Sequence, residues 1–116
     1  MDIKLTSNEF LSIYTGRIIG ESFDVVTNAL GKLYNVNGAE IGPATATCLA
    51  QNFRAYIQEN RKDLAGAVKE IESLKYDRKR DKNIQINEYV KNFEKIIGNN
   101  TITISKTLDN SSDLTF

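Results

Sequence analysis

Three adjacent residues, Thr15, Gly16 and Arg17, place a hydroxyl, a flexible backbone and a guanidinium next to one another at the expected end of a helix. Such a group can hold a phosphate or a carboxylate, because a guanidinium offers paired N–H donors to two oxygens at once. The alternative is structural: a glycine that ends a helix, followed by an arginine on the surface. Thr15 and Arg17 are therefore candidate ligand-binding residues.

A second candidate anion site is the start of the helix expected over residues 43–60. Gly42, Thr45 and Thr47 surround backbone N–H groups that no preceding turn can satisfy, and such groups attract anions. Since every helix has such a start, an ordinary helix terminus is the alternative.

Arginines elsewhere in the chain extend this hypothesis. If the ligand is a small anionic nucleotide, Arg17, Arg54 and Arg61 are expected to converge on one pocket. The predicted ligand-binding residues are then Thr15, Arg17, Thr45, Arg54 and Arg61.

The most basic part of the chain is residues 75–82, where five basic and two acidic residues give a net charge of +3. This stretch could contact a phosphate backbone or an acidic protein. Its aspartates and its single tyrosine equally fit a solvated helix end. The candidate contact residues are Lys75, Tyr76, Arg78, Lys79 and Arg80.

Several kinds of catalytic equipment are missing from the sequence. The chain has no histidine and one cysteine, which excludes histidine-based triads and the spacing of a zinc site. It has no phosphate-binding loop, dinucleotide-binding glycine pattern or calcium loop. We therefore predict a protein that is not an enzyme and carries no cofactor. Cys48 lies among small and apolar residues, which favours a buried structural thiol.

Length and composition predict one domain. The chain has 116 residues, 41% of them hydrophobic, and fifteen basic residues balance fifteen acidic ones. We expect a single globular domain over residues 1–108 and a flexible tail over 109–116. No apolar run reaches the length that a bilayer requires and no signal peptide is evident, so we expect a cytoplasmic protein.

The N-terminal half opens with a short strand at residues 2–5 and a helix that ends at Gly16. Thr6 and Glu9 have the spacing of a capping box. A second helix is predicted from a Ser22 cap to Gly31. Residues 33–41 then predict a short hairpin or, as an alternative, a plain loop.

The clearest helix of the chain is predicted over residues 43–60, because Pro43 suits a first helical position and apolar residues recur every three or four positions. Asp63 is expected to cap another helix, and Asn87 a last helix that ends at Gly98.

Residues 101–105 alternate between polar and apolar side chains and predict a strand. Its partner is either the segment 3–5 or the segment 83–86. The predicted class is α+β and predominantly helical, with four to five helices and a small antiparallel sheet or hairpin.

The N-terminal half also resembles a group of small phage and prophage proteins that form a domain of unknown function. The resemblance rests on Leu11–Ile19, Phe23–Leu30, Gly31–Tyr34 and Ile41–Ala44, and it covers about residues 5–65. The group shares a Ser-Ile-x-Thr-Gly-Arg-Leu opening followed by a helix, a glycine-containing turn and an Ile/Leu-Pro-Arg stretch. This chain has Ala44 where an arginine would follow the proline, and it lacks the group's Thr-His pair near residues 35–38.

The resemblance implies a non-catalytic accessory protein in the cytoplasm of an infected bacterium. Such a protein would act against host defence by stoichiometric binding of a host component, with a host defence protein as the first candidate and a homo-oligomer among its expected states. One alternative is a sponge for a small anionic nucleotide signal, and another is a nucleic-acid-binding regulator that uses residues 75–82. A structural role in the virion is also open.

Overall fold

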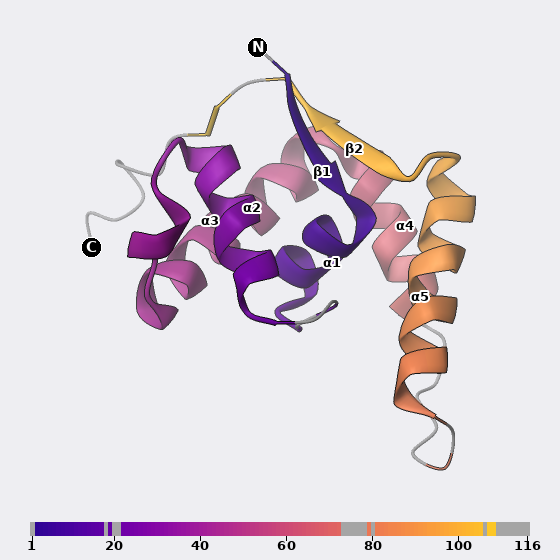
Figure 1. The fold of residues 1–116 in the computed structure, drawn as a ribbon. Coiled ribbons are helices and arrows are strands. Elements are labelled where there is room, and N and C mark those ends of the chain that lie inside the picture. Colours follow the sequence, from indigo (N-terminus) through magenta and orange to yellow (C-terminus); the bar gives the residue numbers. More distant parts are fainter. Residues whose placement is uncertain are drawn as a thin grey trace.

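The computed structural model describes residues 2–17, 19, 22–72, 79, 81–105 and 107–108. Within them the chain forms five α-helices, one 3-10 helix and one two-stranded antiparallel sheet (Figure 1). The elements are β1 (Ile3–Thr6), α1 (Ser7–Thr15), α2 (Asp24–Tyr34), η1 (Gly38–Glu40), α3 (Pro43–Asn60), α4 (Lys62–Glu72), α5 (Lys82–Ile97) and β2 (Thr101–Ile104). The predicted α+β class with predominant helix is confirmed.

The sheet joins the two ends of the described chain. β1 and β2 run antiparallel with Ile3 opposite Ile104 and Leu5 opposite Ile102, and these four side chains are buried. Both strands therefore turn one apolar face to the core, as the alternation of residue types requires. The segment 83–86, the other predicted partner, lies inside α5, so that alternative is wrong.

The start of α1 is fixed by the predicted capping box. The hydroxyl of Thr6 accepts from the N–H of Glu9 at 3.1 Å, and the Glu9 carboxylate accepts from the N–H of Thr6 at 2.9 Å. The buried Glu9 carboxylate also accepts from Nζ of Lys32 at 3.0 Å. The same residue therefore caps α1 and links it to α2.

The predicted end of the second helix at Gly31 is wrong, because α2 continues to Tyr34 and ends at Asn35 in the left-handed conformation. Gly31 lies where the chain folds back: a Cβ there would be 2.8 Å from the carbonyl oxygen of Val36. The glycine thus permits a close backbone approach within the fold.

Two further expectations for this region are corrected. The N-cap position of α2 is Phe23, without a side-chain hydrogen bond, although the hydroxyl of Ser22 accepts from the N–H of Asp24 at 3.3 Å. The predicted hairpin over 33–41 is replaced by the last turn of α2 and by η1. The Asn37 side chain caps η1 by accepting from the N–H of Ala39 at 3.0 Å.

The later helices differ in how well local signals place their ends. α3 spans the predicted residues 43–60, but α4 begins at Lys62, so Asp63 lies in its first turn rather than at its cap. α5 begins at Lys82, where Asp81 accepts from the N–H of Ile84 at 3.0 Å. The predicted Asn87 cap is therefore inside the helix, whereas the predicted end at Gly98 is confirmed.

Aromatic side chains form the centre of the core. The ring of Phe10 on α1 stacks on Phe93 of α5 at 5.4 Å and meets the edge of Phe53 of α3 at 5.7 Å. α1 thereby contacts α3 and α5, helices from both halves of the chain, and α4 packs against both of these helices.

After β2 the chain returns to the other side of the core. The N–H of Leu108 donates to the carbonyl of Leu33 at 2.8 Å, and the Leu108 side chain is buried. The predicted tail over 109–116 lies outside the described residues.

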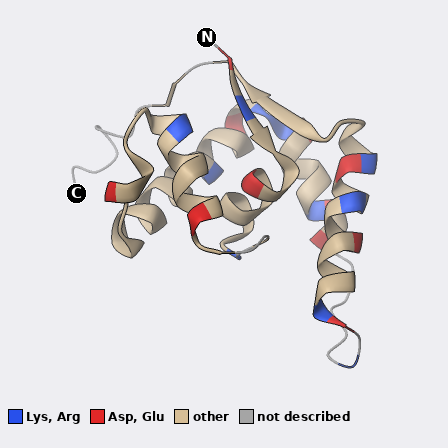
Figure 2. Cartoon of the chain, viewed as in Figure 1, with Lys and Arg blue, Asp and Glu red and all other residues tan. Residues whose placement is uncertain are grey.

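Charge is mixed over the surface. Acidic and basic residues are interspersed along α4 and α5 rather than sorted onto separate helices (Figure 2). No helix among the described residues has the length and apolar character needed to cross a bilayer.

Candidate functional site

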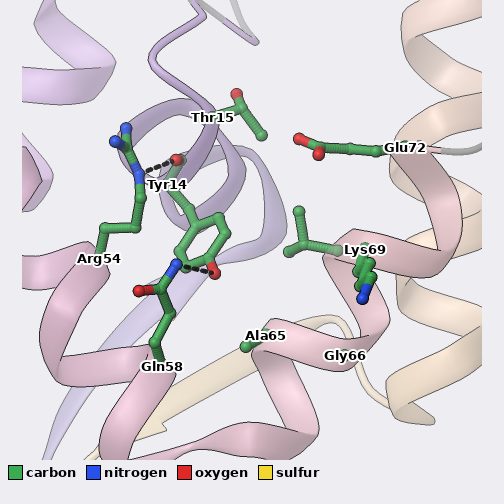
Figure 3. A pocket seen from close by; sticks show the side chains of 9 residues that line it. Tyr14, Thr15, Arg54, Gln58, Ala65, Gly66, Lys69 and Glu72 are labelled. Atoms are coloured by element: carbon green, nitrogen blue, oxygen red, sulfur yellow. Dashed lines mark hydrogen bonds between the residues drawn. The ribbon is translucent and has the colours of Figure 1, made fainter.

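A groove opens where the C-terminal end of α1 meets α3 and α4 (Figure 3). Its volume is about 520 Å³, within the roughly 300–1,000 Å³ of ordinary ligand pockets. The lining residues are Tyr14, Thr15, Arg54, Gln58, Ala65, Gly66, Val68, Lys69 and Glu72. Three helices therefore contribute polar side chains to one open site.

Arg54 holds the end of α1 against α3. Its Nε donates to the carbonyl oxygen of Tyr14 at 2.8 Å, and its guanidinium carbon lies 6.0 Å from the centre of the Tyr14 ring. This bond satisfies one of the carbonyls that a helix end leaves without a partner. No described residue accepts a hydrogen bond from Nη1 or Nη2 of Arg54. The guanidinium therefore retains donors for a ligand.

The turn after α1 lies beside this guanidinium. Gly16 is left-handed, with φ of 72°, and its N–H donates to the carbonyl of Ser12 at 3.1 Å. A Cβ on Gly16 would be 3.9 Å from Nη2 of Arg54. The left-handed conformation therefore favours glycine at this position, while the distance to Arg54 is an ordinary van der Waals contact.

The hydroxyl of Thr15 is already used by the helix end. It donates to the carbonyl of Leu11 at 2.6 Å and accepts from the N–H of Arg17 at 3.3 Å. Because its only proton is committed to Leu11, Thr15 shapes the turn rather than offering a donor to an anion.

The opposite wall comes from α4. Lys69 and Glu72 lie one turn apart and are exposed, while the side chain of Val68 is buried. Figure 3 shows the Glu72 carboxylate extending toward the Thr15 side of the groove. The hydroxyl of Tyr14 accepts from Nε2 of Gln58 at 3.5 Å across the α1–α3 side. The lining thus carries two cations and one carboxylate.

Tyr89 of α5 lies near the Glu72 end of this site. Its hydroxyl oxygen is buried, and no described residue forms a hydrogen bond with it. Burial and, to a smaller extent, the Glu72 carboxylate raise the pKa of Tyr89 to about 12, and Arg17 opposes the shift. The electrostatic effect of both charges places Arg17 and Glu72 in the neighbourhood of this phenol.

The predicted ligand residues are only partly brought together. Thr15 and Arg54 line the groove, whereas Arg17, Thr45 and Arg61 do not. Thr45 is exposed in the first turn of α3, nine residues before Arg54. At 1.5 Å per residue, this separation is about 13 Å along the helix.

Arg61 has structural partners instead. Its Nη1 donates to the carbonyl of Thr103 in β2 at 2.7 Å, and its Nε pairs with Asp63 at 3.2 Å. The hydrogen bond from Arg61 holds the pKa of the Asp63 carboxyl below its usual value. Of the three arginines expected to converge, Arg54 therefore contributes to the groove, while Arg61 links α3 to the sheet.

The basic stretch 75–82 is described only in part. Among its five candidate residues, Lys79 is described and lies exposed in a turn between α4 and α5, while Lys75, Tyr76, Arg78 and Arg80 lie outside the described residues.

Sequence reasoning missed several groove residues. Gln58 lies one turn after Arg54, and Lys69 and Glu72 lie one turn apart, but these spacings are typical of any solvated helix face. The Thr15–Arg17 turn is the part of the sequence that pointed to this groove.

Cys48, predicted to be buried, is half-buried, and no cluster of metal-ligating residues occurs among the described residues.

Comparison with known proteins returned no match to a family model, to a curated protein or to a solved structure.

Proposed function

We propose that the chain is a non-catalytic binding protein that holds its target in stoichiometric amount at the groove between α1, α3 and α4. The observation that carries the proposal is Arg54: one of its nitrogens fixes the fold, and its remaining donors face no described acceptor. A positioned guanidinium on rigid helices is suited to recognition, because little side-chain freedom is lost on binding.

The composition of the groove favours binding over turnover. Among the described residues its lining holds a single carboxylate, Glu72, so acid–base chemistry by paired carboxylates would need a second acid that these residues do not supply. The polar groups that approach one another most closely, Arg54 with Tyr14 and Gln58 with Tyr14, join helices and activate no nucleophile.

The resemblance to small phage and prophage proteins supplies the setting. In that setting the target is a host component, and its sequestration serves the phage against host defence in the bacterial cytoplasm. A host protein is the first candidate target. A small anionic nucleotide signal is the second, and it is favoured by the two cations, Arg54 and Lys69, that line the groove.

Native mass spectrometry of the protein purified gently from a phage-susceptible bacterium tests this proposal. We expect a stoichiometric partner, either a protein or a mass of a few hundred daltons, that is lost in Arg54→Gln and retained in the matched surface variant Lys91→Gln. The same spectrum reports the oligomeric state. Turnover of a nucleotide or peptide substrate that point mutation of the groove abolishes would overturn the proposal.

A further inference from the structure

Gly66 is a glycine in the interior of α4 that the fold itself does not require. Its φ is not positive, and a Cβ placed on it would meet no heavy atom of a described residue within 4 Å. By contrast, Gly31 and Gly38 lie against backbone, where a Cβ would come within 2.8 and 2.9 Å of carbonyl oxygens. Glycine is the least favourable helix residue apart from proline. At Gly66, α4 therefore accepts an unfavourable residue with no packing reason among the described residues.

The position of Gly66 supplies a reason. It lines the groove next to Ala65, one turn before Lys69, so the wall formed by α4 has no bulky side chain there. A bare helix backbone lets a flat or apolar group approach closely, which a larger residue would prevent. The small residues thus form a shelf on the wall opposite Arg54.

The charges around this shelf select the ligand. Arg54 and Lys69 outnumber Glu72, so the groove favours an anion, and a guanidinium binds phosphate oxygens in pairs. The Glu72 carboxylate can accept a hydrogen bond from an N–H or O–H elsewhere on the same ligand. A volume of about 520 Å³ is large enough for more than an inorganic ion.

We propose that the groove binds a phosphate ester of nucleotide size, with its phosphate held by Arg54 and its planar group on the shelf at Ala65 and Gly66. Lys69, on the same wall as the shelf, adds positive charge to the groove. Gly66 is the residue that determines the space for the planar group. This inference rests on the proposed binding function, and it names the class of ligand for the same site.

Thermal unfolding and calorimetric titration with AMP, adenosine and inorganic phosphate test this proposal at constant ionic strength. Ligands that bind only the folded state raise the melting temperature. We expect AMP to raise it, and adenosine or phosphate at the same concentration to have at most a tenth of the affinity of AMP. Equal binding of adenosine and AMP would overturn the role of the phosphate.

Gly66→Ala separates binding from folding, because the two effects have opposite signs. Alanine favours the helix, so we expect the melting temperature of the free protein to rise by a few degrees. The added methyl group occupies the shelf, so we expect AMP affinity to fall at least tenfold. Improved folding with unchanged AMP affinity would overturn the role of Gly66.

Matched variants locate the anion site. Arg54→Gln should lower AMP affinity tenfold or more and Lys69→Gln should lower it less, whereas Lys91→Gln, which removes the same charge from the exposed surface of α5, should leave it unchanged. Ala55→Gly in α3 is the control for helix propensity, with a lower melting temperature and unaltered affinity. Equal losses in Lys91→Gln would reduce the effect to net charge and overturn the site.

Failure of this inference differs from failure of the proposed function. No response to AMP, together with a protein partner that Arg54→Gln releases in native mass spectrometry, would overturn the ligand class and leave the binding function intact. No response to AMP and no partner dependent on Arg54 would overturn both.

Discussion

α3 and α5 are helices of similar length with very different burial. α3 has 18 residues and buries Ala46, Leu49, Phe53 and Ile57, whereas α5 has 16 residues and buries only Phe93. α5 leaves Ile84 and Ile96 exposed to 52% and 42%. Both helices carry apolar residues at helical spacing, so periodicity alone does not explain the difference.

The number of neighbouring helices explains it. α3 packs against α1, α2 and α4, so its apolar stripe is covered along most of its length. α5 packs against α4 and α1 and lies at the edge of the molecule in Figure 1. Buried apolar area follows the contacts that a helix makes, which makes α5 the more weakly held of the two.

Phe93→Ala is the largest expected perturbation of α5. It removes the one fully buried side chain of the helix and its stacking with Phe10, so the free energy of unfolding should fall by about 3–5 kcal/mol. In the Phe93→Ala variant, the amides of α5 should lose more protection against hydrogen exchange than those of α3. Equal loss of protection in both helices would contradict the view that α5 is held separately by this anchor.

Ser12→Ala tests a buried hydroxyl in α1. The Ser12 hydroxyl accepts from the N–H of Ile19 at 2.9 Å, and its single proton can be donated to the carbonyl of Asn8 at 2.6 Å or of Ile19 at 3.1 Å. Its removal leaves buried backbone groups unpaired and should cost about 1–3 kcal/mol in chemical denaturation. The exposed Ser22→Ala should cost about 0.5 kcal/mol or less, and similar costs for the two variants would count against this explanation.

Tyr89→Phe should stabilise the protein, by about 1 kcal/mol at most, because it removes a buried hydroxyl without a described partner. The raised pKa also predicts a pH effect. The folded state favours the neutral phenol. Ionisation of Tyr89 therefore costs no stability below pH 10.0, and the protein loses stability as pH rises from there toward about 12.

Unfolding free energies of the wild type and Tyr89→Phe between pH 9 and 12 measure this effect. The wild type should lose more stability than the variant over that range. Parallel curves would show that the phenol titrates as it does in the unfolded chain.

Ile84→Ala should have the smallest effect, about 0.5 kcal/mol or less, since the Ile84 side chain is more than half exposed. The matched variant Ile57→Ala removes the same atoms from the buried face of α3 and should cost about 2–5 kcal/mol. A large cost at Ile84 would show that α5 is covered in solution, and the comparison between the two helices would then fail.

Interactions over short sequence distances made much of the fold predictable. The capping box of Thr6 and Glu9, the start of α3 at Pro43 and the end of α5 at Gly98 each depend on residues within a few positions. The alternation in Thr101–Ile104 likewise identified a strand before its partner was known. For these elements, backbone hydrogen bonding and side-chain periodicity are local properties, and the residue types are sufficient to indicate them.

Tertiary contacts decided what local signals left open. Gly31 resembled a helix stop, yet it serves the close approach of Val36 and Gly38. The choice of β1 as the partner of β2 depended on packing between the two ends of the chain. A residue that is consistent with two local structures takes the one that buries apolar area and satisfies backbone groups elsewhere in the fold.

The candidate site belongs to this second category. The sequence by itself indicated the Thr15–Arg17 turn and named Arg54, but the bond between Arg54 and Tyr14 spans 40 residues. The other wall, with Gly66, Lys69 and Glu72, comes from α4. Residue types determined which side chains could bind an anion. Only the packing of α3 against both α1 and α4 decided which of them share one groove, because their proximity arises from helix contacts that no short spacing encodes.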